Sequence, residues 1–270
     1  ASEVYVNGEF LPLDRARVVA ARGKWASSGA RLELLPEGES TSAYAAAAPA
    51  PASGHARICL AEVQTAGRGR RGRTWRARPG AAITFTVDRL VDRAPAEFGP
   101  LALAVGVALA ETLSQQGIAD VGLKWPNDLV HDHAKLGGIL VEVRGQAADR
   151  SRALVGVGVN HGRHPDAEAS TSVTAASTGE PCDRSDLAGA LAGATLSAIE
   201  AFEADGGAGH RERWSERDVL AGRRVRADTV HGRLEGTARG VAPDGALLLQ
   251  TPDGREQRLH SAEVSVRGLG

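Results

Sequence analysis

Apolar residues along the chain follow two spacings, and each spacing predicts a different kind of element. Between 82 and 90, the apolar residues Ile83, Phe85 and Val87 alternate with polar ones, which is typical of a strand with two unlike faces. Residues 100–117 begin with a proline, end on a glycine and are apolar nearly all round, so they predict a helix buried against a sheet. Further strands are expected at 32–35, 57–64, 121–125, 129–130, 139–143 and 154–159, and further helices at 14–22, 43–48 and 183–203. Because helices and hairpins are interspersed, the pattern favours an α+β fold over a strictly alternating parallel one.

The two ends of the chain differ from its middle. Near the N-terminus, Asn7-Gly8 lies between alternating apolar residues, which is a strong hairpin signal, and the short helix follows it. Beyond Trp214, short strands are separated by two Pro-Asp-Gly turns. These strands are expected at 223–227, 233–241, 246–250 and 256–259. Short strands need closure to hide their edges, so this region predicts a small barrel of roughly 50 residues. The expected domains are an extension at 1–30, a large domain at 31–218 and the barrel at 219–270.

Composition narrows the classes of function. The 270 residues carry 32 Lys and Arg against 33 Asp and Glu, so no overall charge favours nucleic acid or an anionic membrane. The longest apolar run, at 101–110, is far shorter than the roughly 20 residues that span a bilayer, and no membrane association is expected. Cys59 and Cys182 are too few for a disulfide framework, which indicates a reducing compartment and a cytoplasmic location.

Lysine and asparagine are rare, and their positions are informative. The only lysines are Lys24, Lys124 and Lys135, and the only asparagines are Asn7, Asn127 and Asn160. Arginine replaces lysine almost everywhere, so the lysines that remain mark places where a compact ammonium is needed instead of a planar guanidinium. Three of these residues fall between 124 and 135, and this segment is therefore a candidate for chemistry.

A glycine- and arginine-rich loop at 65–80 is the second candidate. It contains four glycines, six arginines and Trp75, and it has no acidic residue. Glycine lets backbone N–H groups approach an anion, arginine donates forked hydrogen bonds to phosphate or carboxylate, and an indole can stack on a base. The loop is therefore predicted to bind a nucleotide or a similar anion.

Two standard interpretations of this loop fail. Residues 67–72 match the dinucleotide pattern G-x-G-x-x-G, but that pattern needs a helix after its third glycine, and here a strand is expected. No Gly-Lys-Ser/Thr follows, which excludes a Walker A loop. A disordered Arg-Gly segment that binds RNA remains an alternative of a different class, although strands close on both sides disfavour it.

Four motifs together resemble those of biotin protein ligases in order and spacing. They are Gly67-Arg68-Gly69-Arg70-Arg71-Gly72-Arg73 with Trp75, Lys124-Trp125-Pro126-Asn127-Asp128, Lys135-Leu136-Gly137-Gly138-Ile139-Leu140, and Gly156-Val157-Gly158-Val159-Asn160. The resemblance runs from about Leu32 to the C-terminus. It implies a catalytic domain with a mixed sheet, related to class II aminoacyl-tRNA synthetases, followed by a small SH3-like β-barrel. It also implies activation of biotin by ATP with magnesium to biotinyl-5′-AMP, and transfer of biotin to a lysine of a biotin carboxyl carrier protein.

Carried over position by position, the resemblance implies two overlapping sets of contacts. Biotin would be held by Ser40, Thr41, Ser42, Gln64, Arg68, Gly69, Arg70, Lys135 and Gly138. ATP and the adenylate would be held by Arg68, Arg70, Arg71, Arg73, Trp75, Asn127, Asp128 and Asn160. Lys135 and Arg70 would be the catalytic residues, and Asp128 would bind magnesium through ATP. Ser42 departs from the family, whose bacterial members often have asparagine there, and Gly137 replaces a common alanine.

The resemblance also sets expectations about partners. The acceptor would be the biotin carboxyl carrier domain of a biotin-dependent carboxylase. Family members that repress transcription carry a winged helix before the catalytic domain, and about thirty residues cannot hold one, so no DNA binding is expected. A homodimer is left open. The alternatives are a lipoate ligase of the same fold and, from a different class, an RNA-binding protein that uses the Arg-Gly loop.

Overall fold

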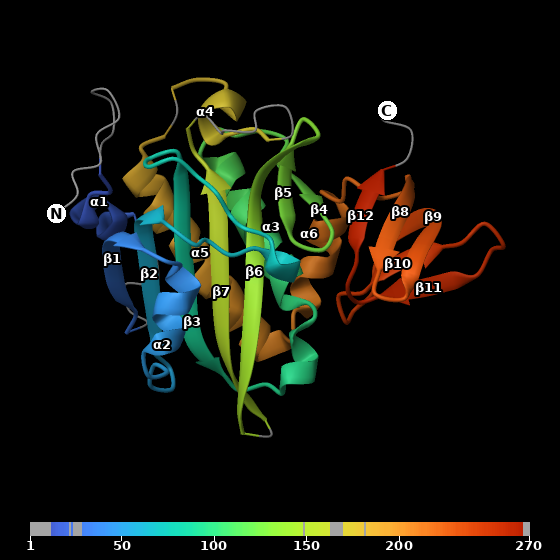
Figure 1. The fold of residues 1–270 in the computed structure, drawn as a ribbon, viewed down its shortest axis with the longest axis horizontal. Helices are drawn as coiled ribbons and strands as arrows, with labels where there is room; N and C mark the ends of the chain where they lie inside the picture. Colours follow the sequence, from blue (N-terminus) through green and yellow to red (C-terminus); the bar gives the residue numbers. More distant parts are fainter. Residues whose placement is uncertain are drawn as a thin grey trace.

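The strands form two sheets (Figure 1). A computed structural model describes residues 12–21, 23, 29–147, 149–162, 170–180 and 182–266. The larger sheet has the order β1-β2-β3-β7-β6-β5-β4, and only β1 and β2 run parallel in it. Its strands are β1 (Arg31–Gly38), β2 (Ala56–Gln64), β3 (Ala82–Val91), β4 (Gly122–Lys124), β5 (Asp128–His131), β6 (Ala134–Ala147) and β7 (Arg150–Asn160). A mixed sheet is what the resemblance to biotin protein ligases implies.

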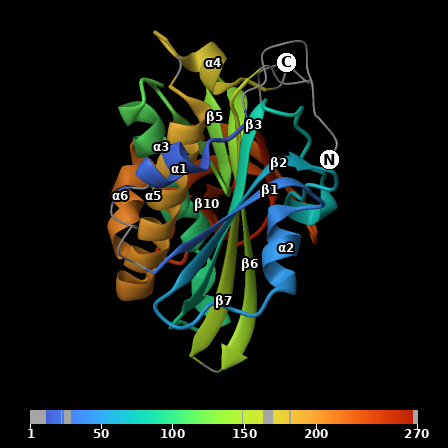
Figure 2. The same ribbon diagram turned by 90° about the vertical axis from the view of Figure 1, so that its left-hand side faces the viewer.

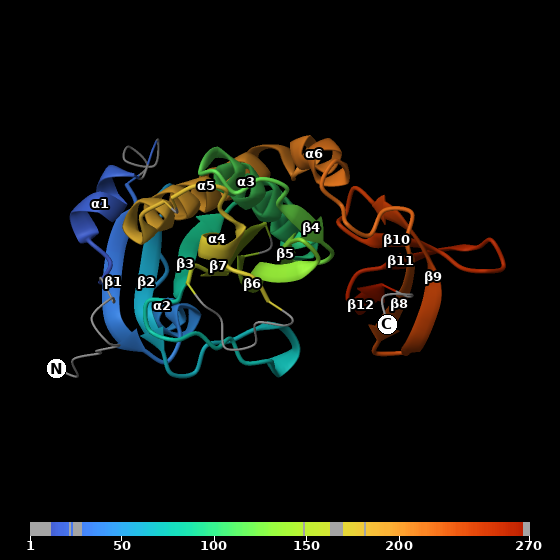
Figure 3. The same ribbon diagram turned by 90° about the horizontal axis from the view of Figure 1, so that it is seen from above.

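Helices cover both faces of the larger sheet and make three layers (Figures 2 and 3). On one face α3 and α5 pack against each other and against the sheet, and α1 packs on α5. On the other face α2 contacts β2, β3 and β7. The helices are α1 (Arg15–Ala20), α2 (Thr41–Ala47), α3 (Leu101–Gln115), α4 (Val173–Ala176), α5 (Arg184–Asp205) and α6 (Arg211–Ser215), with 3₁₀ turns at Arg70–Gly72, Pro95–Phe98 and Ala208–His210.

The apolar character of α3 and α5 follows from their position inside the protein. Nine of the fifteen residues of α3 are buried, because α3 lies between the sheet, α5 and α6. By length and composition, Pro95–Gln115 and Arg184–Asp205 are apolar enough to cross a membrane, with mean hydropathies of 1.4 and 1.2. In each, 61% of the apolar window is buried in the protein, as is usual for core helices.

Most predicted elements are confirmed, and the differences have physical reasons. The strands expected at 139–143 and 154–159 extend into β6 and β7, which pair from Gly137 to Ala147. Backbone hydrogen bonds extend this hairpin beyond its apolar centre into a polar segment, where apolar periodicity cannot indicate a strand. Asp14 caps α1 and accepts hydrogen bonds from the backbone nitrogens of the first turn. The hairpin expected at 3–11 lies outside the described residues.

The smaller sheet is antiparallel and has five strands, one more than the sequence predicts. Its order is β11-β10-β9-β8-β12. The strands are β8 (Arg224–Thr229), β9 (Gly232–Val241), β10 (Leu247–Gln250), β11 (Glu256–Leu259) and β12 (Glu263–Val266). The strand that was missed is β12, which pairs with β8. Its four residues are too few for periodicity to distinguish them from a loop.

The two sheets are joined by close contacts. The indole N–H of Trp125 donates to the carbonyl of Gly245 at 2.9 Å. A side chain at Gly99 would collide with the carbonyl of Asp244, so glycine is needed there. The predicted boundary at 218–219 falls where the chain pairs with β4, because the N–H of Leu123 donates to Arg217 and the N–H of Val219 donates to Leu123. The C-terminal sheet is therefore held against the strands that carry the Lys124–Asp128 motif.

Candidate functional site

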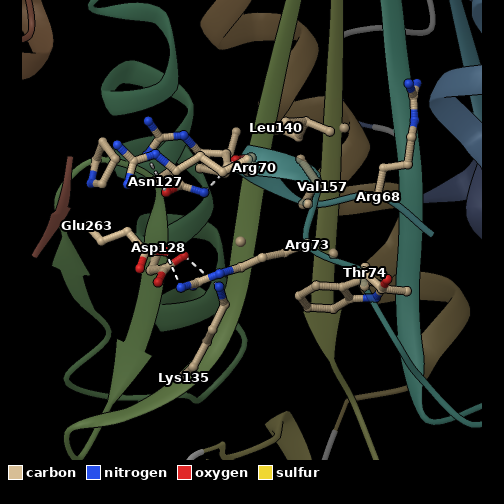
Figure 4. A pocket seen from close by; sticks show the side chains of 18 of the residues that line it. Arg68, Arg70, Arg73, Thr74, Asn127, Asp128, Lys135, Leu140, Val157 and Glu263 are labelled. Atoms are coloured by element: carbon tan, nitrogen blue, oxygen red, sulfur yellow. Dashed lines mark hydrogen bonds and ion pairs between the residues drawn. The ribbon is translucent and has the colours of Figure 1, made fainter. Parts of the chain in front are cut away.

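A cavity of about 380 Å³ opens on the α2 face of the larger sheet, at its junction with the smaller one (Figure 4). This volume lies in the range of small-molecule sites. Its walls come from the start of α2, the loop at 65–80, strands β3, β5, β6 and β7, and residues of β8 and β12. Phe85, Ile139, Leu140 and Val157 give it an apolar wall. The remaining lining carries seven cationic side chains and three acidic ones, so it should attract an anion.

The end of the cavity at α2 is lined by hydroxyl and amide groups. Ser40 is the N-cap of α2, and its side chain accepts from the N–H of Ala43. The N–H of Thr41 donates to Oε1 of Gln64 at 2.8 Å, which ties the start of the helix to the end of β2. Ser42 is also buried at this end. The structure therefore brings together the four residues of the predicted biotin set that precede the loop.

A lysine–aspartate pair lies on the β5–β6 hairpin. The ammonium of Lys135 donates to Oδ1 of Asp128 at 2.7 Å, and both line the cavity (Figure 4). A Cβ at Gly138 would lie 3.3 Å from Nζ of Lys135, so glycine leaves the room that the ammonium needs. The hairpin explains how residues seven positions apart meet, because it folds β6 back along β5.

The arginine-rich loop lies over the cavity and contacts the C-terminal sheet. Arg70 donates to Oδ1 of Asn127 and to Oγ of Ser261, both at 3.2 Å. Arg71 donates to the carbonyl of Asp228 at 3.2 Å, and Arg73 pairs with Glu263 (Figure 4). Burial, together with the neighbouring Arg71, lowers the pKa of Arg70. A partly desolvated guanidinium is stabilised by an anion, so this end of the cavity suits a phosphate.

Trp75 lies across the end of β7 and needs a glycine beneath it. A Cβ at Gly158 would lie 2.6 Å from atoms of the indole, and the backbone N–H of Trp75 donates to Gly67 at 2.9 Å. The loop therefore places the ring against bare backbone. Its Nε1 is buried and has no hydrogen-bond partner among the described residues. A ligand with an acceptor at this position would satisfy that donor.

Two residues of the predicted set lie differently from the others. Asn160 does not line the cavity: its amide donates to the carbonyls of Lys135 and Thr171, and its side chain is buried. It supports the backbone of Lys135, and a direct contact with ATP stays a prediction. Arg68 lines the cavity, but its guanidinium is paired with Glu142 at 2.9 Å and points away from Lys135 (Figure 4). Every other predicted site residue lines the cavity.

Several lining residues were not predicted, and they fall in two groups. In the apolar wall, Phe85 was missed because it belongs to an ordinary strand, whereas Ile139, Leu140 and Val157 lie within the motifs but were not assigned a contact. The second group comes from the C-terminal sheet, well beyond the last motif at 156–160, and has no motif of its own. Its members are Arg226, Asp228, Ala262, Glu263, Val264 and Ser265. The alternation Glu-Val-Ser-Val at 263–266 was the one available signal for β12.

Two segments of the chain match known protein families. Residues 40–160 match the Biotin/lipoate A/B protein ligase family, and residues 221–267 match the Biotin protein ligase C terminal domain. The biotin–[acetyl-CoA-carboxylase] ligase of Paracoccus denitrificans is 32% identical over 244 residues, which cover 87% of this chain and 100% of that protein. The chain belongs to the biotin protein ligase family.

Other members of the biotin protein ligase family support this assignment. The bifunctional ligase/repressor BirA of Escherichia coli is 35% identical over 212 residues, which are 77% of this chain. Those residues are 66% of that protein, so this chain spans about two thirds of its length. The solved biotin protein ligase from Aquifex aeolicus in complex with biotin and ATP superimposes with a TM-score of 0.72 at 25% identity, covering 88% of this chain and 98% of that one. The predicted fold class is therefore confirmed.

Proposed function

We propose that this protein uses ATP to activate biotin as biotinyl-5′-AMP and transfers the biotin to a lysine of a biotin carboxyl carrier domain. The observation that carries the proposal is the order of groups in one cavity: a hydrogen-bonding end at α2, an apolar wall, and a cationic end at Lys135 and Arg70. Biotin has the same order, with a polar ring, an apolar chain and a carboxylate. The relative from Paracoccus denitrificans is a biotin–[acetyl-CoA-carboxylase] ligase, and the solved relative from Aquifex aeolicus holds biotin and ATP.

Neither step of this reaction needs a nucleophile from the protein. In the first step the biotin carboxylate attacks the α-phosphate and pyrophosphate leaves; in the second a lysine amine attacks the mixed anhydride, and AMP and a proton leave. The protein would hold the carboxylate in line with the α-phosphate and stabilise the charge that spreads over it. Lys135 supplies a compact ammonium for this purpose, and Arg70 supplies a partly buried guanidinium.

Magnesium fits this cavity as an ion that enters with ATP. Among the described residues, no group of three or more His, Cys, Asp or Glu could hold a metal ion. Asp128 uses Oδ1 for Lys135, and Mg²⁺ is commonly held by one or two carboxylates together with phosphates and water. Asp128 is therefore the residue that would hold the ion, and Mg²⁺ would offset the charge of the phosphates.

The proposal predicts biotin-dependent exchange of pyrophosphate into ATP by the purified protein. Exchange reports the first step alone and needs no carrier protein. We expect it to require biotin and to be absent with lipoate in place of biotin. Transfer of label from biotin to a purified carrier domain then tests the second step. Exchange that is independent of biotin, or that occurs with lipoate only, would contradict the proposal.

Ligands should also order the loop at 65–80. Arg71, Arg73, Arg76 and Arg78 are exposed, and an anion bound among the arginines would offset their mutual repulsion and help to hold the loop over the cavity. We expect biotin and ATP together to protect this loop from trypsin much more than either ligand alone. Cleavage after Arg255, in an exposed turn of the C-terminal sheet, serves as the internal control and should not change. Equal cleavage of the loop in all conditions would show that it does not close.

A further inference from the structure

A chain of three buried side-chain hydroxyls runs from the polar end of the cavity into the protein. Thr86 of β3 is completely buried behind the cavity wall. Its Oγ1 lies 2.8 Å from Oγ1 of Thr41 and 3.0 Å from Oγ of Ser42. Oγ1 of Thr41 in turn lies 3.3 Å from Oε1 of Gln64. Thr41, Ser42 and Gln64 line the cavity, whereas Thr86 does not line it and reaches it only through Thr41 and Ser42.

The orientation of Gln64 fixes one end of this chain. The backbone N–H of Thr41 can only donate, so the atom that it faces at 2.8 Å must be the carbonyl oxygen of the Gln64 amide. A carbonyl oxygen can only accept, so the hydroxyl of Thr41 gives its proton to Gln64. The amide nitrogen of Gln64 then faces the opposite way, toward Gly67, where it remains a donor.

One proton order satisfies all three contacts. Because the Thr41 proton goes to Gln64, Thr86 must donate to Thr41, and Ser42 must then donate to Thr86. The reverse order gives up the bond between Thr41 and Gln64 and turns the Ser42 proton toward the cavity. The first order makes one hydrogen bond more and leaves no hydroxyl without an acceptor, so it is favoured in a buried site.

The backbone leaves room for this arrangement on the neighbouring strand. Gly156 of β7 lies opposite Thr86 in the sheet. A Cβ at Gly156 would lie 2.9 Å from Oγ of Ser42 and would push that hydroxyl away from Thr86. The contact between Ser42 and Thr86 therefore depends on a glycine that makes no hydrogen bond to either side chain.

We propose that Thr86 is a positioning residue that sets the hydrogen-bond polarity of this end of the cavity. By taking the proton of Ser42, Thr86 makes Ser42 Oγ an acceptor for an N–H of the ligand, while the amide nitrogen of Gln64, another residue of the cavity lining, remains a donor. A cyclic urea, with an N–H next to a C=O, matches this pair, and a dithiolane ring offers neither group. The inference rests on the proposed function, because it takes biotin as the ligand and explains how the site would select biotin over lipoate.

The test is ligand discrimination rather than activity. Binding by calorimetry would compare biotin with the two cyclic carbamates in which a ring oxygen replaces one ureido N–H. The parent protein should prefer biotin by at least about tenfold over the carbamate that lacks the N–H facing Ser42. Thr86→Val frees the Ser42 proton to face the ring oxygen. The ratio of the affinities for biotin and for this carbamate should therefore fall toward one. Thr86→Ser keeps a hydroxyl and should retain the preference for biotin.

Controls separate this effect from a loss of packing. Thr195→Val removes another buried threonine hydroxyl, which donates to Leu191 in α5, and should leave the preference unchanged. If Thr86→Val weakens both ligands equally, or if Ser42→Ala keeps the preference, the assignment is wrong. The Ser42→Ala measurement decides the question even if Thr86→Val does not fold. A parent protein that binds no biotin would overturn the proposed function as well, whereas biotin binding with an unchanged ratio overturns this assignment alone.

Discussion

Lys135→Arg is expected to slow formation of biotinyl-AMP by about 100-fold while leaving the protein folded. The ammonium of Lys135 occupies a confined position between Asp128, at 2.7 Å, and the bare backbone of Gly138. A guanidinium is longer and planar, so it cannot place its donors at the same point, and a displacement of about 1 Å can cost that much in rate. Stability should change by only about 0.5 kcal/mol, because the side chain is partly exposed. Single-turnover adenylation and the thermal midpoint measure the two effects.

The matched control is the reverse exchange at a distant cation. Arg226 of β8 cannot serve as this control, because it lines the cavity. Arg213 of α6 is half exposed and pairs with Glu111 at 3.1 Å, so Arg213→Lys should leave adenylation unchanged. Adenylation by Lys135→Arg within a few-fold of the parent would remove Lys135 from the catalytic role. A large fall in its thermal midpoint would instead make Lys135 a structural residue.

Arg152→Met should have the largest effect on stability, a loss of about 3–5 kcal/mol. Asp88 is completely buried, and both of its carboxylate oxygens accept from Arg152 at 2.8 Å. Arg57 also donates to Asp88, but it cannot replace the two-point contact. Arg152 additionally donates to the carbonyl of Ala45 at the end of α2, so its loss should weaken biotin binding as well. Chemical denaturation and biotin calorimetry measure the two effects.

Two variants test whether the uncompensated charge of Asp88 causes the loss of stability. Asp88→Asn in the Arg152→Met background removes the carboxylate charge and should recover part of the lost free energy of unfolding. Arg150→Met removes an arginine two residues earlier on the same strand, where the pair with Asp92 is exposed, and should change stability little. Equal losses from Arg150→Met and Arg152→Met would mean that burial of the pair is unimportant.

The rare residue types in the sequence were good guides to the cavity. Lys124 and Lys135 line it, as does Asn127, and the third lysine, Lys24, lies outside the described residues. The rarity was informative because arginine can replace lysine on a solvated surface but not at a confined point. Asn160 shows where this reasoning stops, since an asparagine can be equally indispensable for holding backbone carbonyls.

The sequence by itself determined most of the elements, an α+β fold and a glycine- and arginine-rich loop whose groups suit an anion. These follow from apolar periodicity, turn residues and local composition, which act between near neighbours in the chain. It could not show that β12 exists, because four residues carry too little periodicity, nor that Glu263 pairs with Arg73, because that ion pair joins segments separated by almost 200 residues.

Only the tertiary structure decided how the polar groups are connected. Thr86 looks like any strand threonine in the sequence, and its contacts with Thr41 and Ser42 exist because β3 passes beneath the start of α2. The same is true of Arg152, whose partner Asp88 lies on the neighbouring strand. The direction of a hydrogen bond depends on which donors and acceptors are brought within about 3 Å, and that requires the packed fold.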